Sequence, residues 1–541
     1  MGVRVTVGGA LQAVGEGAGG RVGRRWPWHG VAVGGLTTVT AAAYSAFALL
    51  RYYTFQTASY DLVIFDEAVR SYAHFRPGTS IIKGVHNGYG PDFSVLGDHF
   101  SPLLAALAPL YWIHNSPQTL LVAQAVLFAL AIPPLWIFTR RAFGSGGKAT
   151  AAAYLVCAPY ALSWPIAAAV GFDFHEVAFA PVLMAVALER LQAGRLRTVL
   201  IALAALLLVK EDMGFFVAGI GIYLAVSRPR VVKRQLLTGL VLVVVGFAYS
   251  VFATYVLIPA FGGRANYYWA YQSLGNNVPQ AVGHMITHPV SSLRVLITPR
   301  VKLDTMLWLL APFCLLPLTS PIVLAAIPLL LERMLASKFP GWWGISFQYN
   351  AYLVIVFVFA AVDGAARLDR WSVLVREELT AGRARAAGAA ASRGVGTVAL
   401  GCAVAMLGVA VYLVPRFAFG PAFHPSFYHR DARMNAAAAA VAVVPGGVTV
   451  QAVNNLGPQL SGRDTVLLWD GNGRHGPLRP PWVVADVAQP DFTFTGVSQQ
   501  KQDVALLLRT GYRIVFERDG YVVLHRGGYP AGIASSEGGT G

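Results

Sequence analysis

Cysteine is scarce in this chain, which has three in 541 residues, at Cys157, Cys314 and Cys402. Each of the three lies inside an apolar segment, where a thiol behaves as a small buried hydrophobic group. So few cysteines, placed in this way, exclude a disulfide framework and a cysteine-rich zinc site as the basis of the fold.

Charged residues are also scarce, at 13% of the chain, whereas hydrophobic residues make up 55% and the mean hydropathy is +0.54. Repeated apolar runs are long enough to cross about 30 Å of hydrocarbon. The net charge of +16 is not evidence for a nucleic-acid partner, because lysine and arginine lie mainly in the short connections between apolar runs, where they set membrane orientation. We therefore predict a multi-pass protein of the cell (plasma) membrane with no nucleic-acid partner.

The apolar runs and the basic connections predict about eleven spans in a transmembrane domain at 30–415, preceded by a cytoplasmic N-terminal tail at 1–29. The first run is too long for a signal-peptide core and is expected to be a retained anchor. Two pairs of short segments are expected to form hairpins, and 51–116 and 259–302 to be external loops. The expected spans are 30–50, 117–138, 149–169, 177–193, 198–209, 213–226, 236–258, 303–318, 321–335, 349–366 and 395–414.

The C-terminal part differs in kind, and 416–528 is predicted to be a small extracytoplasmic α/β domain followed by a disordered Gly/Ser tail at 529–541. Helices are expected at 431–443 and 498–510. The segment shows no Gly-rich phosphate loop and no nucleophile elbow, which favours a binding or scaffolding role. Strands are expected at 448–453, 465–469, 482–485, 512–516 and 521–525, the last two joined by a turn at Asp519-Gly520.

Four clusters of ionisable residues lie at the ends of apolar segments. A charge at the centre of a membrane helix costs about 2–4 kcal/mol, so acids and bases gathered near the bilayer usually serve a site. The predicted topology puts all four clusters on the extracytoplasmic side, where they could line one cavity. The clusters are Asp61/Asp66/Glu67, Asp98/His99, Asp173/His175/Glu176 and Lys210/Glu211/Asp212.

The first two clusters have a catalytic and a structural interpretation. Asp61 and Asp66 are candidate general bases, because an apolar surround such as Ile64-Phe65 raises a carboxyl pKa toward useful values. The alternative is an interfacial helix cap or a solvated face. Asp98 could cap the apolar helix that follows it, or could bind a ligand together with His99.

The other two clusters combine acids with bases. Asp173, His175 and Glu176 could hold a divalent metal or a phosphate, although their spacing is not a recognised metal signature. Lys210 lies at the tip of a hairpin of short helices and could pair with a phosphate oxygen while Glu211 or Asp212 orients it. The alternative is mutual ion pairing that tolerates burial.

The order of these motifs carries a resemblance over about 45–527. Tyr60-Asp61-Leu62, Gly97-Asp98-His99-Phe100-Ser101-Pro102, Phe172-Asp173-Phe174-His175-Glu176 and Lys210-Glu211-Asp212 resemble the bacterial membrane-protein family called domain of unknown function 2079. The architecture looks like that of the type C glycosyltransferases, polytopic enzymes that use polyprenyl-phosphate sugars and keep an essential acid in the first external loop. Phe65-Asp66-Glu67 is similar to the Asp-Glu pair of the protein O-mannosyltransferases.

The resemblance implies an inverting glycosyltransferase that moves a sugar from a polyprenyl-phosphate donor to a glycan, lipid or protein hydroxyl. Asp66, or in its place Asp61, would be the base, and Lys210 with a histidine would stabilise the leaving phosphate. A divalent ion (Mg or Mn) at Asp173 and Glu176 is a further hypothesis. The alternatives are a transporter or flippase of a lipid-linked intermediate and a non-catalytic envelope assembly protein.

Overall fold

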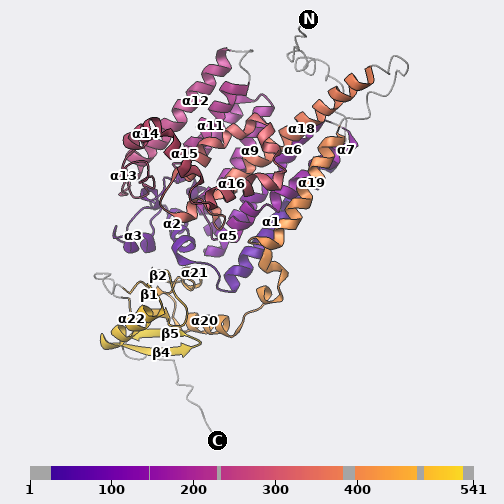
Figure 1. Ribbon diagram of the computed structural model, residues 1–541. Helices are drawn as coiled ribbons and strands as arrows, with labels where there is room; N and C mark the ends of the chain where they lie inside the picture. The colour runs from indigo at the N-terminus through magenta and orange to yellow at the C-terminus, as the bar shows by residue number, and fades with distance from the viewer. Residues whose placement is uncertain (1–25, 145, 228–232, 382–395, 472–479, 528–541) are drawn as a thin grey trace.

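The protein is described here by a computed structural model that covers residues 26–144, 146–227, 233–381, 396–471 and 480–527. Most of the tail at 1–29, all of the tail at 529–541, and part of the basic connections lie outside these ranges. A helical bundle occupies most of the molecule, and a small sheet domain lies at one end of it (Figure 1). A mostly helical chain with a small C-terminal sheet is what the sequence predicts.

Five helical segments of the described chain are long and apolar enough to cross a membrane: Trp28–Tyr53, Pro117–Phe143, Gln235–Ala260, Gln348–Val375 and Thr397–Arg416. Gly147–Ala161 and Trp164–Val170, bent by 47°, make a sixth if they form one span. These spans contain or belong to α1 (Trp26–Tyr53), α5 (Pro117–Ala129), α6 (Ile132–Phe143), α7 (Gly147–Ala161), α8 (Trp164–Val170), α12 (Lys233–Phe252), α13 (Ile258–Ala260), α18 (Ala351–Ala381) and α19 (Thr397–Leu413).

The structure thus confirms a multi-pass protein, but not the predicted eleven spans. Several of the expected spans are short helices: α9 (Phe179–Gln192), α10 (Leu196–Leu207), α11 (Met213–Ser227), α16 (Val301–Leu310) and α17 (Ile327–Leu335). The 14 residues of α9 extend about 21 Å, which is less than the hydrocarbon thickness of about 30 Å. Segment 303–335 is not a plain hairpin, because 3₁₀ turns separate α16 from α17.

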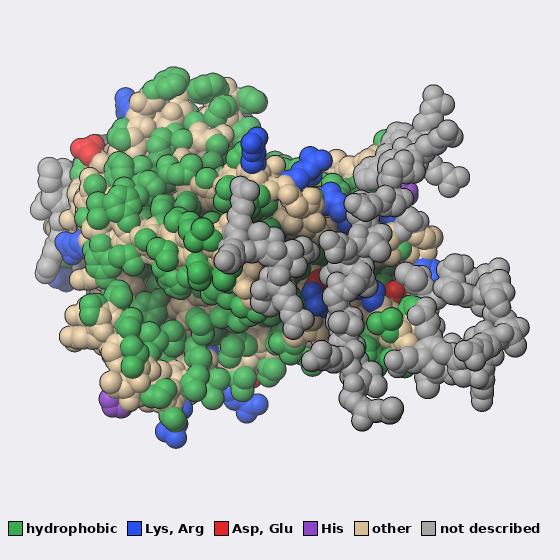
Figure 2. Space-filling model, turned by 90° about the horizontal axis from the view of Figure 1, so that it is seen from above, with side chains coloured by type: hydrophobic (Ala, Val, Ile, Leu, Met, Phe, Trp, Pro, Cys, Tyr) green, Lys and Arg blue, Asp and Glu red, His purple; other side chains and the backbone are tan. Residues whose placement is uncertain are grey.

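The α18 helix forms the centre of the bundle. In its most apolar window 83% of the residues are buried, against 28% in α1, α12 and α19. The outer helices therefore present apolar faces to their surroundings. Viewed from the end opposite the sheet domain, the described surface is mainly hydrophobic, with scattered Lys and Arg side chains (Figure 2).

Close packing of α11 against α12 depends on glycine. A Cβ atom at Gly214 would lie 2.3 Å from the carbonyl oxygen of Gly246, and one at Gly221 would lie 2.5 Å from that of Gly239. Small residues at these positions let two helix backbones approach, as is common in membrane bundles. This packing fixes one wall of the cavity described below.

The C-terminal sheet has the strand order β2-β1-β3-β5-β4. The first three strands, β2 (Thr465–Leu468), β1 (Thr449–Ala452) and β3 (Trp482–Asp486), are parallel, and β5 (Tyr521–Arg526) and β4 (Tyr512–Arg518) continue the sheet antiparallel. All five strands lie where the alternating pattern predicts them. The helices of this domain are α20 (Ala432–Val443), α21 (Gly457–Leu460) and α22 (Val497–Arg509).

The sheet domain docks on the chain that follows α1. Ser59 donates from its amide and its hydroxyl to the carbonyl of Asn454, at 2.7 Å each. The Asn454 side chain accepts from the Tyr60 amide at 3.0 Å. Of the remaining helices, α2 (Ile64–Ala73) and α3 (Ile81–His86) lie at this end of the bundle, and α14 (Val278–Thr287) and α15 (Pro289–Ile297) lie farther from the sheet domain, beside α11 and α12 (Figure 1); α4 (Ala108–Tyr111) packs against α2.

Candidate functional site

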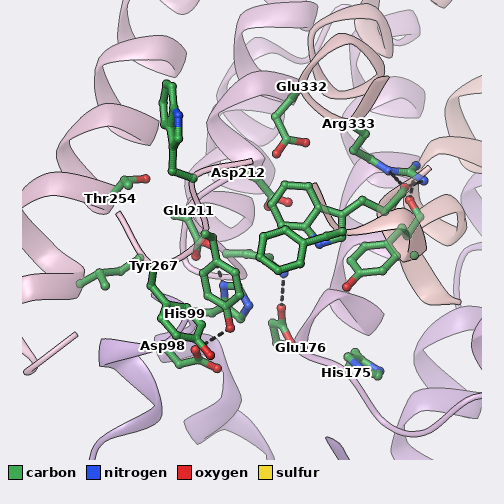
Figure 3. A pocket seen from close by; sticks show the side chains of 18 of the residues that line it. Asp98, His99, His175, Glu176, Glu211, Asp212, Thr254, Tyr267, Glu332 and Arg333 are labelled. Atoms are coloured by element: carbon green, nitrogen blue, oxygen red, sulfur yellow. Dashed lines mark hydrogen bonds and ion pairs between the residues drawn. The ribbon is translucent and has the colours of Figure 1, made fainter. Parts of the chain in front are cut away.

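A cavity of about 610 Å³ is lined in part by Tyr60 and Asp61, next to the segment on which the sheet domain docks. Every one of the four charged clusters contributes at least one residue to its lining, and Figure 3 shows many of these side chains turned toward one space. Three of the candidate residues, Asp66, Glu67 and Asp173, do not line it. The ionisable Asp, Glu, His, Lys and Arg residues of the lining are Asp61, Lys83, Asp98, His99, His175, Glu176, Lys210, Glu211, Asp212, Arg264, Glu332 and Arg333.

Lys210 is paired across the cavity wall. Its Nζ lies 2.9 Å from Oε1 of Glu176, and the carboxylate side chain is 2% exposed. Burial by itself raises the pKa of Glu176, but the charges of Lys210, His99 and His175 outweigh it and lower the pKa to about 2. The sequence pointed to Glu211 or Asp212 as the partners of Lys210; the nearest carboxylate comes instead from a different cluster.

Glu211 binds the segment that carries the Asp98/His99 cluster. Its Oε1 lies 2.7 Å from Nδ1 of His99, and its Oε2 accepts from the Phe100 amide at 3.1 Å. The Tyr268 ring stacks on the imidazole, with centroids 4.7 Å apart. Asp212 has a buried Oδ1 without a hydrogen-bond partner among the described residues.

Asp98 forms an ion pair that the sequence did not reveal. Its Oδ2 lies 2.9 Å from Nζ of Lys83 on α3, and its Oδ1 accepts from the Tyr268 hydroxyl at 2.7 Å. Lys83 also donates to the Tyr60 hydroxyl at 3.3 Å. Burial raises the pKa of Asp98, but the charges of Lys83 and His99 outweigh it and lower the pKa overall. The aspartate is therefore an anion here rather than a free helix cap.

Asp61 faces the cavity beside a histidine. Its Oδ1 lies 3.4 Å from Nε2 of His175, and its side chain is 30% exposed. Burial lowers the pKa of His175, but Asp61, the Glu176 charge and the hydrogen bond to the Asp173 backbone together outweigh it, and the pKa is raised. Asp173 lies behind this pair, where its Oδ2 accepts from the Ala58 amide at 2.8 Å. Burial and then the Asp61 charge raise the pKa of Asp173 to about 7.

Asp66 and Glu67 connect helices instead of lining the cavity. The Asp66 side chain is 0% exposed, and it accepts from the Tyr111 hydroxyl at 2.7 Å and from Nη2 of Arg70 at 2.6 Å. Glu67 accepts from the Ser80 hydroxyl at 2.9 Å and from the Ile82 amide at 3.1 Å. These contacts connect α2 to α4 and α3. The positions of Asp66 and Glu67 therefore do not support the prediction that these two residues are catalytic.

Within the described ranges, Asp173 and Glu176, the residues expected to hold a divalent ion, lack the further ligands that such an ion needs. Across the part of the chain that the structure describes, no group of three or more His, Cys, Asp or Glu side chains is arranged to hold a metal ion. Lys210 engages Oε1 of Glu176 and the Ala58 amide engages Oδ2 of Asp173, whereas the other oxygen of each carboxylate is buried without a hydrogen-bond partner among the described residues. The residues present therefore do not form a site that fits Mg²⁺ or Mn²⁺, which prefer several oxygen ligands.

Several lining residues were missed by the sequence analysis. Glu332 and Arg333 lie on α17 inside an apolar segment, so the rule that singled out the four clusters applied to them as well. Arg264 precedes a run of aromatic residues in the 259–302 loop and lies over the Tyr89 ring at 5.3 Å. Among the described residues it has no carboxylate partner, unlike Lys83 and Lys210.

The wall formed by α12 and the turns after it carries both polar and apolar side chains, with Ser250 and Thr254 adding hydroxyl groups. Val251, Tyr255 and Ile258 line the cavity there, on a segment of which only 28% is buried. The cavity therefore has charged groups on one side and, on the other, a candidate span of which only a minor part is buried.

These features define a multi-pass membrane protein with a charged cavity next to an extramembrane sheet domain. The chain matches, over residues 51–523, the family described as "Predicted membrane protein (DUF2079)", and it belongs to that family. No curated protein matches it. Among solved structures, the apo form of the Archaeoglobus fulgidus oligosaccharyltransferase is similar, with 12% identity and a TM-score of 0.39 over 83% of this chain and 69% of that one.

Proposed function

We propose that this protein is a membrane glycosyltransferase that moves a sugar from a polyprenyl-phosphate donor to an acceptor hydroxyl on a glycan, lipid or protein. The observation that carries the proposal is the cavity, which combines acids, bases and aromatic rings with the apolar side chains of Val251 and Ile258 on a candidate span. A donor with a lipid chain, a phosphate and a sugar needs all of these surfaces. Orientation of the cavity toward the extracytoplasmic side is part of the proposal.

The lipid chain of the donor lies along α12 in this proposal, and its phosphate binds Arg264. This arginine lines the cavity and has no carboxylate partner among the described residues, so its charge is available for an anion. A guanidinium can bind two phosphate oxygens at once. Lys210 is less suited to the phosphate, because the carboxylate of Glu176 at 2.9 Å already balances its charge.

Asp61 takes the role of general base. It lines the cavity, whereas Asp66 is enclosed by Tyr111 and Arg70. The acceptor hydroxyl gives its proton to the Asp61 carboxylate while its oxygen attacks the anomeric carbon from the face opposite the phosphate. The bond between that carbon and the phosphate oxygen breaks, and its electron pair stays with the phosphate. One such displacement inverts the anomeric centre.

Donor binding provides the test. Purified Arg264→Gln in nanodiscs should bind a polyprenyl-phosphate hexose about tenfold or more weakly than the wild type, since a charge-assisted bidentate contact is lost. Arg294→Gln is the matched control, because Arg294 is an exposed arginine on α15 outside the cavity. Equal donor affinity in wild type and Arg264→Gln would remove Arg264 from the proposed donor site.

A further inference from the structure

A second cavity, of about 670 Å³, shares no lining residue with the first. The segment between α19 and α20 forms most of it, and Gln56, just after α1, closes it. Its basic lining residues are His424, His429 and Arg430, and its larger apolar ones are Phe417, Phe427 and Met434. The proposed transfer chemistry uses none of these residues.

The cavity begins where two membrane spans end. The α1 span ends at Tyr53 and the α19 span at Arg416, both at the end of the bundle that carries the sheet domain (Figure 1). Large aromatic side chains are exposed around it, including Tyr412 at 60% and Phe423 at 63%. Exposed aromatic residues at the end of a span are typical of the membrane–water interface. If the two spans cross the membrane as proposed, we expect the cavity to lie at the level of the lipid headgroups.

Arg430 is held in place and keeps donors free. Its Nε donates to the carbonyl of Tyr53 at 2.8 Å, and its guanidinium lies over the rings of Tyr53 at 3.8 Å and Phe55 at 4.9 Å. Within the described ranges no carboxylate pairs with this guanidinium. An arginine side chain that is already fixed on aromatic rings loses little further conformational entropy when it binds an anion.

The cavity has an excess of basic over acidic groups. Among the described residues that line it, one is acidic, Asp431, and that carboxylate already accepts from the Met434 amide at 2.7 Å as the N-cap of α20. Arg51 lies near by and donates to the carbonyl of Gln56 at 2.8 Å. A ligand here therefore meets arginine and imidazole donors together with apolar rings.

We propose that this cavity binds the phosphate headgroup of an anionic phospholipid, with the acyl chains lying on the outer faces of α1 and α19. The guanidinium of Arg430 and the imidazoles of His424 and His429 would contact the phosphate. Phe417 and Phe427 would contact the glycerol and upper acyl region, which a soluble phosphate does not have. The bound lipid would hold the segment that joins the last span to the sheet domain against the membrane.

The test compares lipids on the full-length protein. Delipidated wild type in neutral detergent, supplied with equal amounts of phosphatidylglycerol and phosphatidylcholine, should bind phosphatidylglycerol preferentially by native mass spectrometry. In Arg430→Gln/His424→Gln/His429→Gln this preference should fall by about tenfold or more. The control variant Arg509→Gln/Arg513→Gln changes exposed arginines of the sheet domain and should retain it. Donor binding at the first cavity should be unchanged in both.

Three results would overturn the proposal. They are equal retention of the two lipids by the wild type, an unchanged preference in the triple variant, and displacement of phosphatidylglycerol by inorganic phosphate at equal concentration, which would indicate a site for free phosphate. If the triple variant does not fold, the single variant Arg430→Gln must show the same loss of preference, because it leaves both histidines and the Asp431 cap in place.

Discussion

Lys210 and Glu176 lie 2.9 Å apart, ammonium to carboxylate, and join the tip between α10 and α11 to the segment that leads into α9. The pair links two clusters that are 34 residues apart in the chain. It explains how a lysine is accommodated between two short apolar helices. Because Lys210 is paired in this way, we propose that Arg264, and not Lys210, binds the donor phosphate.

This pair predicts a loss of stability when one partner is removed. Lys210→Met should lower the free energy of unfolding by about 3–5 kcal/mol, because it leaves the Glu176 carboxylate buried without its counter-charge. The double variant Lys210→Met/Glu176→Gln should recover part of the loss. Denaturant unfolding in detergent measures both. If Lys210→Met kept wild-type stability and lost donor binding, the phosphate contact would return to Lys210.

The Asp66 contacts predict a structural role for that carboxylate. Tyr111→Phe removes one hydrogen bond to a buried charge and should cost about 1.5–3 kcal/mol of stability. Transfer activity per folded molecule should stay near wild type. Tyr428→Phe is the control, since its hydroxyl bonds an exposed carbonyl at 2.8 Å. Full stability with lost activity in Tyr111→Phe would restore a catalytic role to Asp66.

From the raised pKa of Glu67 we expect the stability of the protein to depend on pH. Burial raises its pKa to about 7 despite hydrogen bonds from Ile82 and Ser80. Because the pKa is higher in the folded state than in the unfolded state, the contribution of this group is complete below about pH 4.5 and is lost as the pH rises through about 7.

Glu67→Gln should therefore show a smaller fall in unfolding free energy between about pH 5 and about pH 8 than the wild type, by up to about 3 kcal/mol. The amide oxygen of glutamine can still accept from Ser80 and Ile82. Unfolding at the two pH values measures the difference. Identical pH profiles for variant and wild type would contradict the prediction.

The orientation can be tested by labelling. In a background without Cys157, Cys314 and Cys402, a cysteine at exposed Arg513 should react with a membrane-impermeant thiol reagent in intact cells. A cysteine at exposed Arg195, in the basic connection before α10, should react only after permeabilisation. The reverse pattern would put the sheet domain and the cavity in the cytoplasm.

The strands of the sheet could be predicted from the sequence because the residue patterns that indicate them are local in the chain. Alternating residues and the Asp519-Gly520 turn mark β4 and β5, and short apolar runs mark the parallel strands. The number of spans could not be predicted from the sequence, because hydropathy does not distinguish a membrane span from a short helix buried in protein. The α9 helix is as apolar as a span but has only 14 residues.

The candidate site was predicted in outline for a related reason. Charge within an apolar chain is conspicuous, so all four clusters were found. The choice between Asp61 and Asp66 depends on tertiary contacts: Tyr111 reaches Asp66 from 45 residues away. Lys83 lies on the short helix α3 and Arg264 in a loop, where a single basic residue carries no periodic signal, and only the fold brings them to the cavity.

The most direct test of the proposed function is the release of polyprenyl phosphate from a polyprenyl-phosphate hexose by purified protein supplied with extracted envelope acceptors. Asp61→Asn should lower the rate by about 100-fold to 10,000-fold while donor affinity and stability stay near wild type, because the amide keeps the shape of the side chain but cannot take the proton. Asp304→Asn, which changes a half-exposed aspartate outside the cavity, should leave the rate unchanged. A wild-type rate in Asp61→Asn would contradict the account.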